Sequence, residues 1–167
     1  MFIKTMASNV PFTRQIAWLP VIVQIIFIWL LIYLFDLAGF TQPFIFAAVT
    51  YVILAFLLRN IFAKQHRTGI RLVKQHRFAE AIPYFQKSYA YFSQQSWVDR
   101  YRFLTLLSAT AMSYREMGLC NIAFCYAQIG EGQKAKEYYQ LTLKDYPQNG
   151  LAITGLNMLN SFDEQKA

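Results

Sequence analysis

A chain of 167 residues has room for one ordinary domain, or for a membrane anchor joined to a small domain. Hydrophobic residues make up 56% of the sequence and the formal net charge is +7, which argues against a typical soluble domain. The apolar surplus lies early in the chain, because Asp36 is the only ionised side chain between Ile16 and Leu58. This distribution indicates a membrane segment followed by a segment that meets water.

Two apolar runs are each long enough to cross a bilayer. The first covers residues 16–35, and the second covers residues 43–63 and begins at Pro43, a residue that favours a helix start. At about 1.5 Å of rise per residue, such helices match a hydrocarbon layer of roughly 30 Å. A short polar turn that contains Gly39 separates the two runs. We therefore predict a transmembrane helical hairpin within residues 1–64.

Other interpretations of these runs fit less well. A cleaved signal peptide needs a shorter apolar core and a small-residue cleavage site, and a lipoprotein signal needs a cysteine where Phe40 stands. Core helices of a soluble domain usually carry a polar face, which these runs lack. Gln24 and Thr50 are interpreted as polar contacts between the two helices, with a polar pathway in an oligomer as the alternative.

The net charge is concentrated beside the apolar runs. Residues 1–77 carry eight basic side chains and one acidic one, whereas residues 78–167 carry eight of each sign. Cationic flanks stay on the cytoplasmic side, so we expect an integral protein of a bacterial cytoplasmic membrane with both termini cytoplasmic. Nucleic-acid binding is not expected, because no recognition motif accompanies the charge. The side chains expected to face lipid headgroups are Arg59, Lys64, Arg67, Arg71, Lys74 and Arg77.

Residues 65–167 show helical periodicity and no strand-length alternation. Apolar residues recur at offsets of three and four from Phe78 to Phe92, and again from Ala135 to Tyr146. A final helix over residues 151–162 is expected to cap the domain after Pro147. The fold class is therefore predicted to be all-α.

Two segments repeat one pattern at a distance of 54 residues. A turn position is followed by an alanine after five residues, an aromatic residue after four more and a small residue after three more. The residues are His76, Ala81, Phe85 and Ser88 in the earlier copy, and Gly130, Ala135, Tyr139 and Thr142 in the later copy. The pattern resembles the tetratricopeptide repeat. The positions that match the packing residues of that family are Gly69, Ala81, Phe85, Ala123, Tyr126, Gly130, Ala135, Tyr139 and Pro147.

The sequence departs from that family in its spacing. The distance of 54 residues between Ala81 and Ala135 exceeds the usual period of about 34. The excess lies between Ser93 and Arg115, where helical spacing resumes after a polar break. We expect this stretch to lengthen the first helix of the later repeat, with a bend near Gly118.

The resemblance implies a domain that binds proteins. Repeats of this kind hold a peptide or a helix of a partner on the face lined by their first helices. In this sequence the matching face is mostly apolar, so a groove there should prefer an apolar or amphipathic segment. Alternatively, the final helix or the membrane-proximal extension covers it. The candidate groove residues are Val73, Lys74, Met117, Phe124, Ala127 and Gln128, with His66, Ile70 and Cys120 beside them.

No group of residues suggests catalysis or a bound cofactor or metal. His66 and His76 are expected to be solvated or to face headgroups. Cys120 and Cys125 lie about 140° apart around one helix, so they are predicted to be small buried side chains. We therefore expect no enzyme, but a membrane-anchored scaffold or assembly factor with a protein partner. The alternative is an accessory or protective subunit whose hairpin binds another membrane protein.

Overall fold

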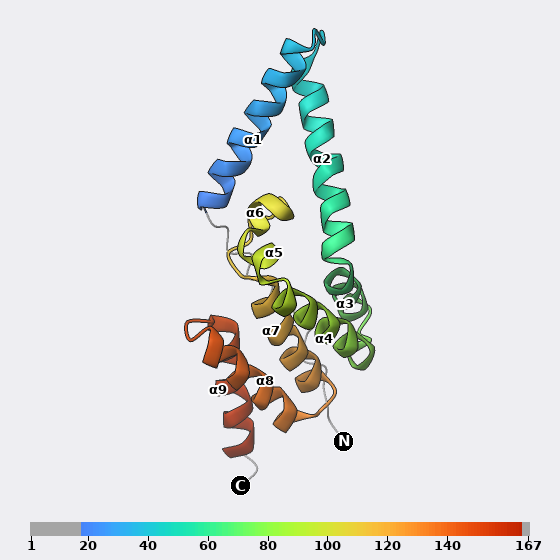
Figure 1. Cartoon of the computed structure of the whole chain (residues 1–167). Helices are drawn as coiled ribbons and strands as arrows, with labels where there is room; N and C mark the ends of the chain where they lie inside the picture. The colour runs from blue at the N-terminus through green and yellow to red at the C-terminus, as the bar shows by residue number, and fades with distance from the viewer. Residues whose placement is uncertain (1–17, 165–167) are drawn as a thin grey trace.

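The computed structural model describes residues 18–164, and these form nine helices and no strand (Figure 1). The all-α prediction is confirmed for this part of the chain. Residues 16 and 17 of the first predicted run, and the basic residues Lys4 and Arg14, lie outside the described residues. The helices are α1 (Trp18–Leu37), α2 (Pro43–Phe62), α3 (Lys64–Lys74), α4 (Phe78–Gln94), α5 (Ser96–Arg100), α6 (Arg102–Thr105), α7 (Tyr114–Gln128), α8 (Gly132–Asp145) and α9 (Gly150–Glu164).

Helices α1 and α2 are long and apolar enough to cross a membrane, as the two apolar runs predicted. They meet at a turn in which Gly39 has a φ of 80°, and they diverge from it toward their other ends (Figure 1). The Tyr51 hydroxyl donates a hydrogen bond to Gln24 Oε1 at 3.2 Å, which is the kind of interhelical contact expected of Gln24. None of the residues described in α1 is buried, so its surface is free to meet lipid or protein.

The hairpin joins the rest of the chain through a packed junction rather than a linker. Only Ala63 separates α2 from α3, and its side chain is 1% exposed. It belongs to a core cluster with Phe92, Val98, Leu106 and Tyr114. The end of α2 is therefore fixed against helices from later in the sequence.

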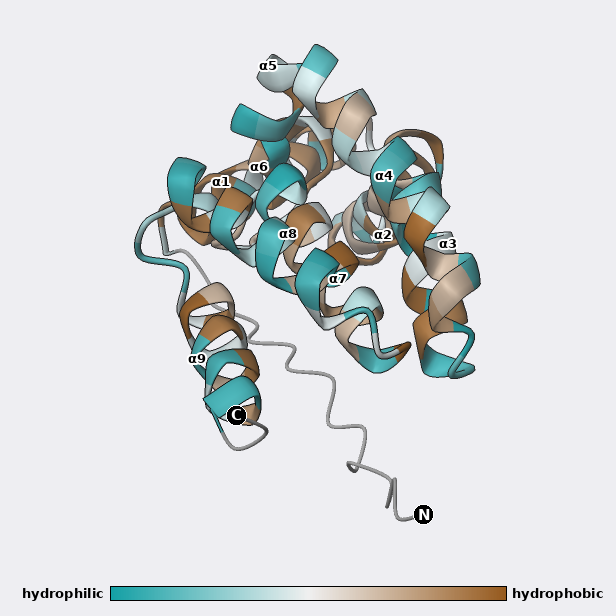
Figure 2. Cartoon of the chain, turned by 90° about the horizontal axis from the view of Figure 1, so that it is seen from below, coloured by the Kyte–Doolittle hydropathy of each residue, from teal (hydrophilic) through white to brown (hydrophobic). Residues whose placement is uncertain are grey.

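Helices α3 to α9 form a row in which each long helix packs on the next. Helix α3 packs on α4, α4 on α7, α7 on α8 and α8 on α9. Seen from the end opposite the hairpin, α8 is mostly hydrophilic, whereas hydrophobic residues recur along α9 (Figure 2). The expected final helix is present as α9, which covers α8 with Ala152, Leu156 and Leu159.

The turns of the two helical hairpins α3–α4 and α7–α8 have the same geometry. His76 and Gly130 occupy the matching position, and both have positive φ, at 59° and 83°. The next backbone N–H donates to a carbonyl five residues earlier in each copy: Arg77 to Leu72 and Glu131 to Tyr126, both at 3.0 Å. The sequence repeat is thus also a repeat in the structure.

The aromatic residues of the repeat lie in the core, as predicted. Phe85 is fully buried, and a Cβ added to Gly69 would lie only 2.7 Å from its ring. Tyr139 is 7% exposed and shares a cluster with Ala123. A Cβ on Gly155 of α9 would lie 2.4 Å from the Tyr139 ring. Because Gly69 and Gly155 have no side chain, their helices can pack closely against the rings of Phe85 and Tyr139.

The prediction of a lengthened, bent first helix for the later repeat is wrong. The extra residues form the short helices α5 and α6 and a non-helical segment over residues 106–113. Helix α7 begins at Tyr114 because Ser113 and Glu116 form a capping box: Ser113 Oγ accepts from the Glu116 N–H at 3.1 Å, and Glu116 Oε2 accepts from the Ser113 N–H at 3.3 Å. Gly118 instead allows close packing, since its Cβ would lie 3.4 Å from that of Tyr89.

Candidate interaction surfaces

The structure divides the predicted groove residues into buried and accessible ones. Val73 is 3% exposed and belongs to the core cluster between α3, α4 and α7, so its assignment to an open groove is wrong. Cys120 is 5% exposed, and Met117 packs against the cluster around Phe92. These side chains were misassigned because the face of α3 and α7 that the resemblance assigned to a partner packs partly on α4.

The accessible part of the predicted groove lies at the ends of α3 and α7. Phe124 is half-buried and packs edge-on against Phe78, with ring centroids 5.9 Å apart. Lys74 and Gln128 are exposed and occupy matching positions in the two helical hairpins. We call this surface the α3–α7 end. It consists of Lys74, Ala127, Gln128 and the 41% exposed Ile129, which sequence reasoning missed.

His66 is buried, so the expectation that it is solvated or faces headgroups is wrong. It is 6% exposed and lies edge-on to Phe85 and Tyr114, at centroid distances of 5.4 and 5.2 Å. Its Nδ1 is 3.4 Å from Ser88 Oγ. Burial lowers the pKa of His66 to about 4, which keeps the ring neutral near pH 7. His76 is exposed, as expected.

Four of the six basic residues assigned to the membrane surface form a stripe on α3. All four are exposed and have offsets of 0, 3, 7 and 10, which place them on one helix face; they are Lys64, Arg67, Arg71 and Lys74. Arg67 donates to Asn60 Oδ1 and lies over the Phe56 ring, 5.6 Å from its centroid. Because Asn60 and Phe56 belong to α2, Arg67 connects the stripe to the flank of that helix. None of the four forms an ion pair with an acidic side chain among the described residues.

The other two basic residues have partners within the protein. Arg59, expected to extend to the headgroups, instead donates from Nε to the Leu106 carbonyl at 3.1 Å and from Nη2 to the Leu107 carbonyl. Arg77 forms an ion pair with Glu80 at 2.5 Å, and both side chains are exposed. The basic stretch therefore combines an exposed stripe on α3 with a structural arginine, Arg59.

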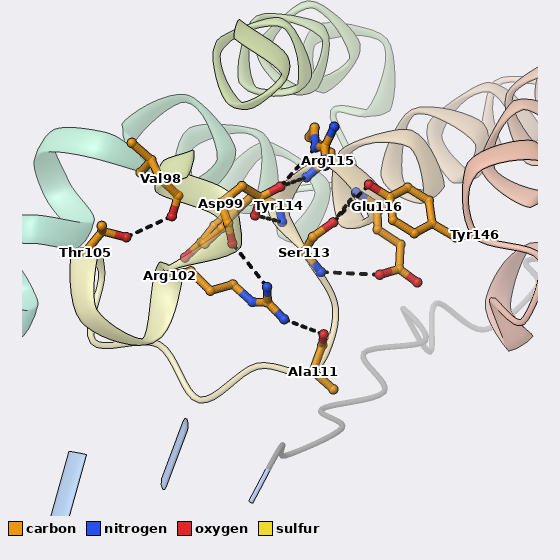
Figure 3. A network of polar contacts seen from close by, with 10 residues as sticks. All are labelled: Val98, Asp99, Arg102, Thr105, Ala111, Ser113, Tyr114, Arg115, Glu116 and Tyr146. Carbon is orange, nitrogen blue, oxygen red and sulfur yellow. Dashed lines mark hydrogen bonds and ion pairs between the residues drawn. The ribbon is translucent and has the colours of Figure 1, made fainter. Parts of the chain in front are cut away.

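A buried carboxylate fixes the start of α7 (Figure 3). Asp99 of α5 is 1% exposed, and its Oδ1 accepts a hydrogen bond from the Tyr114 N–H at 2.7 Å. Its Oδ2 accepts from the Arg115 N–H at 3.2 Å and lies 3.4 Å from Arg115 Nε. A negative charge at this position satisfies free N–H groups and favours the positive end of the helix dipole.

Arg102 and Thr105 hold the segment around α6 together (Figure 3). Arg102 donates to the carbonyls of Asp99 at 3.1 Å, Thr110 at 3.0 and 3.1 Å, and Ala111 at 2.5 Å. Thr105 Oγ1 donates to the Val98 carbonyl at 2.8 Å. Sequence reasoning missed this network, although the Ser113–Glu116 capping box was a readable signal of the break before α7.

A cavity of about 410 Å³ lies between the end of α8 and the starts of α7 and α9, near Glu116 and Asn149. These polar groups bond to each other and to the backbone: Asn149 Nδ2 donates to Glu116 Oε1, and Asn149 Oδ1 accepts from the Ala152 N–H, both at 2.8 Å. The side chains of Glu116 and Asn149 therefore connect α7 to the start of α9.

The described residues contain no cluster of metal ligands, and both cysteines are buried. No group of three or more possible metal ligands is present in residues 18–164. Cys120 and Cys125 are free and buried, and burial raises the pKa of each thiol to about 12. This agrees with their prediction as small buried side chains.

The chain matches no protein-family model, no curated protein and no solved structure. The fold defines it as an all-α protein in which two membrane-length apolar helices precede a row of helices. The resemblance to tetratricopeptide repeats therefore stays a prediction from the sequence pattern.

Proposed function

We propose that this chain is a membrane-anchored protein-interaction module, a scaffold or assembly factor. In this proposal α1 and α2 span the cytoplasmic membrane of a bacterium, and α3 to α9 present a tetratricopeptide-like surface to the cytoplasm. The observation that supports it most is the repeated helical hairpin, whose two turns share the same backbone hydrogen bonds at a distance of 54 residues. Stacked helical hairpins are an architecture that serves binding rather than catalysis.

The positions of the charges support the orientation. The α3 stripe lies directly after α2, and its Arg67 contacts α2 near the end where anionic headgroups of the cytoplasmic leaflet would be. The turn between α1 and α2 contains no lysine or arginine. This asymmetry follows the positive-inside rule. Two free cysteines in α7 also suit a reducing compartment.

The proposed contact surface is the α3–α7 end. It combines the exposed Lys74 and Gln128 with the apolar Ile129, and the half-buried Phe124 of α7 packs on Phe78. An apolar centre with a polar rim is typical of surfaces that bind an amphipathic segment.

The second candidate function places the binding element in the hairpin. It is favoured by α1, in which none of the described residues is buried. A helix with so much free surface can pack against a second membrane protein as well as against lipid.

Site-specific photocrosslinking in the source cells distinguishes these functions. A photoreactive residue replaces Gln128 at the α3–α7 end, Gln140 on the exposed side of α8, or Ile26 on the exposed surface of α1. We expect a discrete protein adduct from position 128 and none from position 140. Lys74→Glu should remove the adduct, whereas the matched charge reversal Lys144→Glu should leave it.

The opposite pattern would support the hairpin. An adduct from position 26 that survives Lys74→Glu, with none from position 128, would contradict the scaffold proposal. Both lysines are exposed, so neither reversal should disturb folding, and unchanged helical circular dichroism checks this.

A further inference from the structure

We infer that the segment of α5 and α6, residues 96–105, is an in-plane membrane element that inserts Trp97, Tyr101 and Leu104 into the interfacial layer of the bilayer. This inference rests on the proposed function in one respect, because it requires α1 and α2 to cross the membrane. It adds a third point of attachment, which lies in the helical domain and fixes that domain against the lipid surface.

The segment lies between the open ends of the membrane hairpin. Helix α6 contacts α1, and Arg59 in the last turn of α2 bonds to the carbonyls of Leu106 and Leu107, directly after α6. Figure 1 shows α6 between the two helices, near their ends opposite the turn. If α1 and α2 span the bilayer, α6 lies at the depth of the cytoplasmic headgroups and the first acyl carbons.

The side chains that this segment exposes are those that favour a membrane interface. Trp97 is 56% exposed, Tyr101 48% and Leu104 52%. Tryptophan and tyrosine are enriched at the depth of the headgroups because an apolar ring and a polar group each find a suitable medium there. Three large apolar side chains exposed within eight residues are unusual for a surface that meets only water.

The charges of the segment fit a lipid surface. Its single acidic residue, Asp99, is 1% exposed and lies on the side of α7. Of its two arginines, Arg102 is committed to backbone carbonyls, and Arg100 is exposed. An exposed cation next to Tyr101 in the sequence complements anionic headgroups.

Side chains donate hydrogen bonds to several backbone carbonyls around α6. Such partners are also what a backbone at membrane depth, with little water, requires. Arg59, Arg102 and Thr105 donate to carbonyl groups that are left free by the short helices and the non-helical residues. The carbonyls served in this way are those of Val98, Asp99, Leu106, Leu107, Thr110 and Ala111. At membrane depth, irregular backbone is tolerated where such partners exist.

We assign lipid to the surface formed by Trp97, Tyr101 and Leu104 because this surface adjoins the apolar surface of α1 and α2. Apart from Asp36 at the turn end of α1, the large exposed side chains of α1 and α2 are apolar over the length of a bilayer, and α6 contacts α1 directly. The lipid layer that surrounds the hairpin therefore also meets Leu104.

Depth-dependent fluorescence quenching tests the inference on the full chain in liposomes of phosphatidylcholine and phosphatidylglycerol. Three variants each keep one tryptophan: Trp97, Trp29 in α1, or a tryptophan from Ile153→Trp on exposed α9, with phenylalanine at the other native sites. The quenchers are phospholipids with bromine on the upper acyl chain. We expect a loss of Trp97 emission that approaches that of Trp29, an emission maximum at shorter wavelength than the α9 control, and no quenching of that control.

The other outcomes separate the inference from the proposed function. If Trp29 is quenched while Trp97 behaves like the α9 control, the hairpin is in the bilayer and the in-plane element is overturned. If Trp29 is not quenched either, the membrane-spanning hairpin fails and the inference falls with it. The replaced side chains are all exposed, so folding should be preserved, and circular dichroism checks this.

Discussion

The helical hairpins α3–α4 and α7–α8 share one backbone turn but differ in what their first helices contact. Helix α3 follows the apolar hairpin of α1 and α2 directly, exposes four cations, of which Arg67 contacts α2, and buries the neutral His66. Helix α7 begins at a buried carboxylate, Asp99, and contains two buried thiols. The same local structure thus carries an exposed basic stripe in one copy and is fixed to the extra segment by a buried carboxylate in the other.

The largest expected effect concerns the aromatic residue that each copy buries. Phe85→Ala and Tyr139→Ala should each lower the free energy of unfolding by about 3–5 kcal/mol, because each leaves a large cavity in a core cluster. Thermal melts of the full chain in mild detergent, followed by circular dichroism, measure the loss. The exposed neighbours provide matched controls: Gln86→Ala and Gln140→Ala should change little. A harmless substitution in one copy alone would mean that the two hairpins are not equivalent.

The next effect separates the copies by pH. The pKa of His66 is about 4 in the folded protein and about 6.5 in an unfolded chain, so between these values only the unfolded state gains a proton. Stability should therefore fall by about 3 kcal/mol as the pH drops from about 6.5 to 4, at about 1.4 kcal/mol per pKa unit.

Denaturant titrations from pH 7.5 to 4 measure this loss. His66→Gln should remove most of the dependence, whatever it does to stability at pH 7.5. His76→Gln, which changes an exposed side chain, should retain it. An equal slope in the protein and in His66→Gln would show that His66 is not the titrating group.

The smallest effect lies in the turns themselves. Gly130→Ala should cost about 1 kcal/mol, since its φ of 83° strongly favours glycine, and the cost is one of backbone strain because an added Cβ would meet no atom within 4 Å. His76 already bears that strain at φ 59°, so His76→Gly should not destabilise the protein. Gly132→Ala in the first turn of α8 is the control and should stabilise slightly. A loss for Gly132→Ala as large as that for Gly130→Ala would contradict the backbone explanation.

Features set by local pattern were predictable from the sequence. The membrane-length helices were predicted at residues 16–35 and 43–63, and the structure has them at Trp18–Leu37 and Pro43–Phe62. The repeat was readable because its turn depends on a few residues at fixed spacing. The buried aromatic positions followed from the same spacing.

Features set by distant contacts were not predictable in this way. Helical spacing continues from Val98 through Leu104, so periodicity alone does not reveal that the chain breaks into α5 and α6. The break is stabilised by bonds from Asp99 to the start of α7, fifteen and sixteen residues later. The burial of His66 depends likewise on packing against Phe85 and Tyr114.

The central claim is that α1 and α2 cross the membrane with the helical domain on the cytoplasmic side. Thr41→Cys in the turn and Gln140→Cys on α8 place one exposed thiol at each end of the molecule. The native Cys120 and Cys125 are buried, with thiol pKa values of about 12, so the unsubstituted chain serves as the blank. Intact cells treated with a membrane-impermeant maleimide should label Thr41→Cys and not Gln140→Cys, which should label only after the membrane is opened. Labelling of both thiols in intact cells, or of Gln140→Cys alone, would contradict this arrangement.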